Sequence, residues 1–558
     1  MRAAVLGRNI RLDGWTVGPY LAAAIVALPV ATVVAVGLFG EGEDVWRHLA
    51  ATVLPVYAWN SLQLLVGVGL GVVIVGVGTA WLVTMCRFPG RSVLEWALLL
   101  PLAMPAYVIA YVYTDLLEYA GPVQALLRDA FGWTSARDYW FPEIRSMGGA
   151  IAMFSLVLYP YVYLLSRAAF LEQSVGQLKV SRTLGRGAWA TFAFVAVPLA
   201  RPSIAIGVSL ALMEVLNDLG TVEFFAVNTF TRGIFNVWFG MNNVTGAAQI
   251  ATLLLLVVLA ILAAESYSRR RRRFRASYAS YHDLPASPLA RGRAAAAVAA
   301  CALPVVLGFV LPALVLADYA LRHHADALAA SYWRFVGNSI GLSSAAAAVA
   351  VILAISLAYA RRLRRDPLLD AAIRLAVVGY AVPGAVLAIG VLIPFGWFDN
   401  TLDALMRGRF DISTGLLLSG TLFAALFAYV VRFLAVAYGA LDASFAKVSV
   451  SMDRAARTLG AGPRRTLLDV HVPLVGASTL TAALLVFVDG MKELPMTLIL
   501  RPFNFDTLAT HVFEFAGDER LEPAALAALT IVVAGIIPVV ILNRMIGSSR
   551  PGSRRARD

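Results

Sequence analysis

The sequence predicts an all-α integral membrane protein with twelve transmembrane helices, arranged as two parallel six-helix repeats. Of its 558 residues, 60% are hydrophobic and only 14% are charged, which is far from the composition of soluble proteins. Continuous apolar runs of about 18 or more residues indicate helices that cross the bilayer, whereas a barrel would show short alternating strands. The predicted spans are 18–39, 60–85, 93–118, 147–170, 200–226, 246–267, 294–317, 335–360, 371–398, 413–438, 477–500 and 523–546.

The positions of Arg and Lys predict the orientation, because cytoplasmic loops of membrane proteins are enriched in both. If both termini are cytoplasmic, the cytoplasmic segments contain 33 of the 46 Arg and Lys residues and the external loops contain 11. The remaining two, Lys492 and Arg432, lie deeper inside spans, while the 33 include Arg167, Arg201, Arg374 and Arg544 at the cytoplasmic ends of spans. This topology and attraction to anionic lipid headgroups explain the net charge of +12, so the charge does not indicate nucleic-acid binding.

The second half of the chain repeats the first at a nearly constant offset. Asn60-Ser61-Leu62 matches Asn338-Ser339-Ile340, and Pro105 matches Pro383, both at an offset of 278. Six spans separate equivalent positions, so the two halves have the same orientation and are parallel repeats. We expect a first half at residues 1–267, a basic cytoplasmic linker at 268–293 and a second half at 294–558.

The strongest repeat is a polar segment between the fourth and fifth spans of each half. Between residues 179–199 and 454–474, 10 of 21 positions are identical without a gap, including Arg-Thr-Leu-Gly-x-Gly and a final Pro-Leu. Gly185 and Gly460 follow Thr-Leu, where glycine can adopt the positive φ that ends a helix. We therefore expect, in each half, two short helices joined by a tight turn on the cytoplasmic membrane face, where they could insert into a groove of a partner.

These segments resemble the cytoplasmic EAA loop of ABC importer permeases, and two copies in one chain resemble fused permeases that supply both halves of the pore. The resemblance implies the type I ABC importer permease fold, with EAA-like loops at 172–199 and 442–474 that dock onto two copies of an ABC ATPase. Lys179 and Arg454 stand where the family has its glutamate, so any salt bridge of that glutamate must be absent or reversed here. The coupling residues implied are Lys179, Arg182, Thr183, Leu184, Gly185, Gly187, Arg454, Arg457, Thr458, Leu459, Gly460 and Gly462.

The chain has no sequence in which it could bind ATP itself. A phosphate-binding P-loop needs a Gly-Lys pair, and the three lysines, Lys179, Lys447 and Lys492, follow Leu, Ala and Met. We therefore expect a permease subunit that is not an enzyme and binds no cofactor, with ATP and Mg bound by a separate ATPase. An ion-gradient transporter without an ATPase is a remote alternative that leaves the duplicated loop unexplained. A membrane enzyme is weaker still, because no nucleophile–base or metal-ligand cluster is evident.

Acidic residues lie at equivalent places in the fifth and eleventh spans. Glu214 and Asp218 are four residues apart, as are Asp489 and Glu493, so each pair would lie on one helix face. Carboxylates at this depth are costly and usually face a cavity or a partner, and Lys492 could neutralise the second pair. They could line a polar pathway for a cationic or hydrated substrate, or instead make interhelical hydrogen bonds or lie at hydrated helix ends. The candidate pathway residues are Glu214, Asp218, Glu223, Asp489, Lys492 and Glu493.

Longer segments make the resemblance more specific. Residues 212–223 and 229–241 in the first half, and 491–497 and 501–510 in the second, resemble permeases of bacterial ferric-iron importers. This implies ferric iron as substrate, a periplasmic binding protein that delivers it, and a place in the bacterial inner membrane. An ABC permease for thiamine, sulfate, polyamine or phosphonate is the alternative. The adjacent His323 and His324 would point apart and do not predict a metal site, so the sequence identifies no metal ligands.

Overall fold

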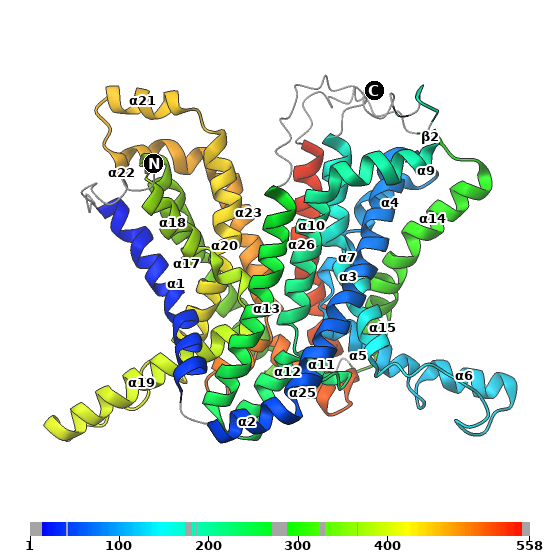
Figure 1. Cartoon of the computed structure of the whole chain (residues 1–558), viewed down its shortest axis with the longest axis horizontal. Coiled ribbons are helices and arrows are strands. Elements are labelled where there is room, and N and C mark those ends of the chain that lie inside the picture. The colour runs from blue at the N-terminus through cyan, green and yellow to red at the C-terminus, as the bar shows by residue number, and fades with distance from the viewer. Residues whose placement is uncertain are drawn as a thin grey trace. The chain divides into compact units, whose positions relative to one another are not determined.

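The computed structural model describes residues 14–40, 43–172, 181, 183–185, 187–270, 287–323, 330–364 and 366–548 (Figure 1). Lys179 and Arg182, residues 271–286 of the linker and both termini lie outside these ranges, so the expectations about them stay predictions.

Long apolar helices form most of the described structure, which confirms the all-α membrane fold class. Among the described residues, eleven helices are long and apolar enough to cross a membrane, or twelve if a bent pair counts as one span. The long helices are α1 (Gly14–Phe39), α3 (Leu54–Met85), α7 (Met147–Glu172), α10 (Val197–Asn217), α13 (Val244–Arg270), α14 (Arg291–Val305) with α15 (Leu311–Arg322), α17 (Ala330–Leu363), α19 (Gly384–Phe410), α20 (Leu422–Lys447), α23 (Val472–Met491) and α26 (Leu521–Ser548).

Shorter elements connect the long helices. Four π-helical turns occur among them, each continuous with a neighbouring helix: η2 (Phe192–Ala196), η3 (Asn236–Gly240), η4 (Val306–Val310) and η6 (Leu467–His471). The other short elements are α2 (Glu43–Thr52), α4 (Arg91–Ala97), η1 (Leu100–Ala103), α5 (Ala106–Leu117), α6 (Pro122–Phe131), α9 (Ala188–Thr191), α11 (Gly220–Phe224), α12 (Phe230–Phe235), α18 (Pro367–Ala376), η5 (Val378–Ala381), α21 (Val450–Thr458), α22 (Pro463–Thr466), α24 (Pro495–Leu500) and α25 (Leu508–Gly517).

The third and ninth predicted spans are not continuous helices, which corrects the sequence prediction. The helical segment that ends at Ala103 is bent by 91° from the one that begins at Ala106. Pro105 and Pro383, equivalent in the repeat, each stand immediately before the next helix with an extended backbone (ψ 141° and 143°). Proline has no N–H and disfavours helical geometry in the residue before it, so both spans break at the same repeat position.

The described helices pack into two compact units that each combine segments of both halves of the sequence. One unit contains Met1–Phe39 and Gly337–Phe505, and the other contains Gly40–Val336 and Asp506–Asp558. In the first unit α1 packs against α18 and α19, and a Cβ on Gly390 would lie 2.3 Å from the Pro29 carbonyl oxygen. In the second, α15 packs against α26. Such close approaches of small residues are typical of membrane helices.

A two-residue parallel pair joins the end of α3 to the described end of the linker. In it β1 (Cys86–Arg87) lies beside β2 (Ser287–Pro288), and the Leu289 N–H donates to the Arg87 carbonyl at 3.2 Å. This pairing ties the start of the second half of the sequence to the unit that contains α3.

Candidate functional site

The second hairpin, residues 442–474, consists of α21 and α22 beyond the ends of α20 and α23 (Figure 1). Gly460 has a φ of +78°, its N–H donates to the Arg457 carbonyl at 3.0 Å, and the Ala461 N–H donates to the Ala456 carbonyl at 2.9 Å. These two bonds are those of a Schellman motif, which closes the carbonyl end of a helix. The structure therefore confirms the predicted glycine-terminated turn.

The turn of the second hairpin presents an apolar side chain surrounded by cations. Leu459 is 86% exposed, and Arg454, Arg457 and Thr458 are also exposed. Gly462 begins α22 with an ordinary negative φ of −69°, so only Gly460 needs glycine's conformational freedom. An exposed leucine in an arginine-rich turn suits contact with a partner protein that has an apolar groove and acidic residues.

The first hairpin, residues 172–199, has the same turn in the part that the structure describes. Gly185 has a φ of +80°, Leu184 before it is 75% exposed, and Thr183 and Gly187 are exposed as well. The hydroxyls of Ser181 and Thr191 lie 3.0 Å apart and are buried, so they hold the two arms of the hairpin together. The two leucines thus occupy equivalent, outward-facing positions.

The acidic residues of the first half do not share one helix face, contrary to the sequence prediction. Glu214 lies on α10, but α10 ends at Asn217 and the Asp218 backbone is extended, with a ψ of 131°. The carboxylate of Asp218 accepts the Thr221 N–H at 2.7 Å. Short side chains such as aspartate compete with the helix by bonding to nearby backbone N–H groups, and here this bond turns the chain into α11.

Glu223 on α11 is held by Arg232 of α12. Both of its carboxylate oxygens accept from Arg232, at 2.8 Å from Nε and 3.2 Å from Nη2. Arg232 Nη1 also donates to the Asn228 Oδ1 at 2.8 Å, and Asn60 donates to the Asn228 carbonyl at 3.1 Å. This network joins α11 and α12 to α3.

In the second half each acid has a basic partner. Asp489 on α23 lies 3.1 Å from Lys492, which confirms that Lys492 neutralises this pair in part. Glu493 lies beyond the end of α23, so it does not share a helix face with Asp489, contrary to the sequence prediction. Its carboxylate is 3.6 Å from the Arg432 guanidinium of α20. Glu493 also accepts the Met496 N–H at 3.3 Å, at the start of α24. The sequence shows that Arg432 lies inside a predicted span, but nothing in the local sequence indicates that it pairs with Glu493, 61 positions away.

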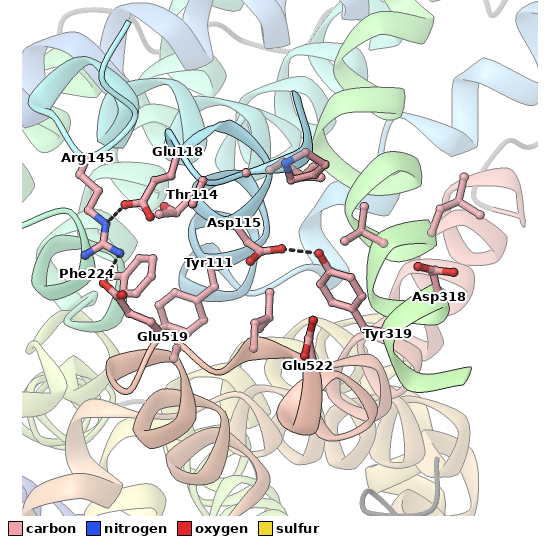
Figure 2. A pocket seen from close by; sticks show the side chains of 18 of the residues that line it. Tyr111, Thr114, Asp115, Glu118, Arg145, Phe224, Asp318, Tyr319, Glu519 and Glu522 are labelled. Carbon is pink, nitrogen blue, oxygen red and sulfur yellow. Dashed lines mark hydrogen bonds and ion pairs between the residues drawn. The ribbon is translucent and has the colours of Figure 1, made fainter. Parts of the chain in front are cut away.

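A polar cavity of about 720 Å³ lies among α5, α11, α15 and the α25–α26 connection (Figure 2). Arg145 forms ion pairs with Glu118 and Glu519, the latter at 2.7 Å, and its guanidinium lies 4.8 Å from the centre of the Phe224 ring. Tyr319 donates a hydrogen bond to Asp115 on the other side of the cavity. The charged lining residues are Asp115, Glu118, Arg145, Asp318, Arg322, Glu519 and Glu522.

The sequence prediction did not include this cavity, because its lining comes from five segments that are far apart in the sequence. Within the described residues, no group of three or more His, Cys, Asp or Glu side chains could hold a metal ion. The structure describes His323, which lies 3.5 Å from Glu522, whereas His324 lies outside the described residues.

Comparison with known proteins gives the family. Residues 71–273 match the family described as binding-protein-dependent transport system inner membrane component. Over 513 residues the chain is 25% identical to the Fe(3+)-transport system permease protein FbpB 2 of Haemophilus influenzae, covering 91% of this chain and 93% of that protein.

Two Escherichia coli relatives match shorter segments. The molybdenum transport system permease protein ModB is 31% identical over 153 residues, which cover 27% of this chain and 63% of the relative. The sulfate transport system permease protein CysT is 28% identical over 153 residues, which cover 27% and 52%.

The family match lies in the first half, and the internal repeat extends it to the second. The duplicated hairpins, the equivalent proline breaks and the long similarity to one relative of comparable length all agree with this assignment. Residues 71–273 therefore belong to the family of binding-protein-dependent transport system inner membrane components, and the chain as a whole is similar to a permease of comparable length.

Proposed function

We propose that this permease carries ferric iron from a periplasmic binding protein into the cytoplasm by alternating access. The observation that carries the proposal is the similarity to the Fe(3+)-transport permease over 91% of the chain, since the other two relatives cover 27% each. We place the protein in the bacterial inner membrane with both termini in the cytoplasm, where the Arg-rich connections lie.

The charges of the first half support a cationic cargo. Three acidic residues, Glu214, Asp218 and Glu223, lie close together in the sequence of the first half, and Glu223 pairs with Arg232. Carboxylate oxygens suit hard cations such as a ferric ion better than they suit oxyanions such as sulfate or molybdate. The six pathway candidates are in this view the polar wall that the cargo passes.

The two hairpins are the proposed docking points for two copies of an ABC ATPase. Leu184 and Leu459, exposed at equivalent turns, would enter apolar clefts on the two ATPases, with Arg454 and Arg457 at the rim of the second contact. Closure of the ATPases on ATP and Mg would then move the hairpins and, through η2 and η6, the helices α10 and α23. The chain itself would bind no nucleotide and no cofactor.

The substrate assignment is tested by uptake into proteoliposomes that contain the permease, its ATPase and its binding protein. We expect ATP-dependent accumulation of radioactive ferric iron, and no accumulation of molybdate or sulfate supplied with the same binding protein. Accumulation of an oxyanion without iron would contradict the ferric assignment and favour the second candidate, an oxyanion permease, to which the 31% identity with the molybdenum permease points. Thiamine, polyamine and phosphonate uptake are measured in parallel.

A further inference from the structure

One arginine joins three parts of the second hairpin and its supporting helices. Arg362, at the end of α17, donates from Nε and Nη2 to the same Asp453 carboxylate oxygen, at 3.0 and 2.6 Å. Its Nη1 donates to the Phe445 carbonyl at 2.7 Å, and its Nη2 also reaches the Val448 carbonyl at 2.8 Å. The guanidinium therefore holds the end of α20 and the start of α21 together, which the planar arrangement of its N–H groups allows.

The other oxygen of Asp453 is bonded to a buried histidine. His471 Nε2 lies 2.7 Å from Asp453 Oδ1, and the His471 side chain is fully buried beside the rings of Tyr359 and Phe445, 5.4 and 5.5 Å away. His471 is the last residue of η6, so Asp453 connects α21 to the base of α23. Among the described residues, His471 Nδ1 has no hydrogen-bond partner, so Asp453 supplies the polar contact that orients the ring.

The Asp453 carboxylate remains charged at neutral pH. Burial raises its pKa, but hydrogen bonds and charge from Arg362 and His471 outweigh burial, and the pKa of Asp453 lies below its ordinary value. Because the carboxylate is ionised, His471 Nε2 must carry the proton that it donates.

The first half cannot form the same cluster. At the repeat offsets of 278 and 275, the positions of Arg362, Asp453 and His471 are taken by Thr84, Leu178 and Ala196. The Thr84 hydroxyl donates to the Ala80 carbonyl within its own helix at 2.6 Å, and Ala196 and Leu178 have no polar side chain. At the equivalent place Trp81 packs against Phe170 and Phe192, with ring centres 5.7 and 5.0 Å apart.

We propose that Arg362, Asp453 and His471 form a latch, which makes the second hairpin stiffer than the first. The proposal rests on the proposed docking of the hairpins onto ATPases. A force on α21 would pass through the Asp453 carboxylate to Arg362 on α17 and to His471 on η6, and from Arg362 to the Phe445 carbonyl on α20, because these contacts are short, directional and largely shielded from water. In the described part of the first half, the Ser181 and Thr191 hydroxyls join the two arms, but the contacts at the place equivalent to the latch are the ring contacts of Trp81, which can slide and would transmit the same movement less directly. These three are positioning residues.

The chain offers a matched control on the same helices. Arg361, next to Arg362, pairs with Asp442 of α20 at 2.9 Å, and this ion pair joins α17 to α20 without including α21, α22 or η6. Asp453→Asn removes the latch charge, whereas Asp442→Asn removes a charge from a neighbouring pair. The double variant Arg362→Met/Asp453→Leu avoids a buried unpaired charge and serves if Asp453→Asn folds poorly.

The experiment uses the full transporter in proteoliposomes and measures cargo transported per ATP hydrolysed. We expect Asp453→Asn and the double variant to lower this ratio at least tenfold while ATP hydrolysis continues, and Asp442→Asn to change it less than twofold. If the latch acted only through stability, the double variant would recover both its thermal midpoint and its coupling ratio. Normal coupling in the folded double variant would overturn the proposal.

A second readout separates failure of the latch from failure of the proposed function. A nitroxide label on Met452→Cys of α21, with Cys86 and Cys301 replaced by alanine, reports the mobility of the hairpin without ATP or cargo. We expect greater label mobility in Asp453→Asn and the same mobility as wild type in Asp442→Asn. Unchanged mobility in Asp453→Asn would overturn the latch. A wild-type transporter that shows no ATP-driven uptake but the expected mobility change would overturn the proposed function alone.

Discussion

Replacing Glu493 with glutamine should destabilise the permease by about 3–5 kcal/mol, because it leaves the Arg432 charge buried without its carboxylate. The two side chains are 5% and 4% exposed and their charged groups are 3.6 Å apart. At that separation and an effective dielectric constant of about 20, the attraction is about 5 kcal/mol. Glutamine keeps the side-chain oxygen that accepts the Met496 N–H, so the substitution removes charge and little else.

The assay is thermal unfolding of the purified permease in detergent, arranged as a double-mutant cycle of Glu493→Gln, Arg432→Met and the combined variant. In a unit of about 200 residues, a loss of 3 kcal/mol should lower the unfolding midpoint by at least about 6 °C. The combined variant should lie close to wild type, since no buried charge remains unpaired. Effects of the two single substitutions that simply add, within about 0.5 kcal/mol, would refute the reasoning.

Three further predictions follow from the backbone and from titration. Valine at both Gly185 and Gly460 should cost about 1–2 kcal/mol per site in the left-handed region, where an added Cβ meets no atom within 4 Å. The protein should therefore stay in the membrane but hydrolyse ATP without uptake, and undiminished uptake would contradict the coupling role. Glu519 has a φ of +58°, so Glu519→Gly should be more stable than Glu519→Ala by about 1 kcal/mol in thermal unfolding, although both lose the ion pair with Arg145. Equal stability of the two variants would show that the backbone there is unstrained. Burial lowers the pKa of His511 below its ordinary value, against a smaller opposing effect of the charge on Glu514. His511 therefore binds a proton less readily in the folded protein than in the unfolded chain. Its contribution to the free energy of unfolding should be fully present above a pH of about 6.5 and should be lost as the pH falls through the lowered pKa. His511→Phe should remove this pH dependence, and an unchanged slope would contradict it.

The features that local sequence determines were predictable. The turns at Gly185 and Gly460 follow from a glycine after a short helical segment, and the structure gives both the positive φ expected of them. The pairing of Asp489 with Lys492 is also local, because residues three apart on a helix are neighbours. The number of spans was also predictable, because it depends almost entirely on the length and composition of the apolar runs.

The features that the sequence could not reveal depend on contacts between distant segments or on competing local bonds. Asp218 was expected on the same face as Glu214, but its carboxylate bonds to the Thr221 N–H and ends α10. The partner of Glu493 lies on another helix, and no spacing rule connects it to Arg432. The presence of α1 in the unit formed mainly by the second half, and of α14, α15, α25 and α26 in the other unit, likewise depends on which helix faces fit together.

The same limit explains why the latch was missed. Asp453 adjoins a position that the resemblance to EAA loops had already singled out, yet its partners Arg362 and His471 are 91 and 18 positions away. The useful signal was a difference between the repeats: polar residues stand in the second half where Thr84, Leu178 and Ala196 stand in the first. Departures from internal symmetry are therefore as informative in this chain as the symmetry itself.

The most direct test of the account is whether the permease needs an external source of work. The purified chain should be reconstituted alone in liposomes, and again with its ATPase and binding protein, and cargo accumulation against a gradient measured with and without ATP. We predict uphill accumulation only when both partners and ATP are present. Uphill accumulation by the chain alone, with no added subunit, would contradict the account.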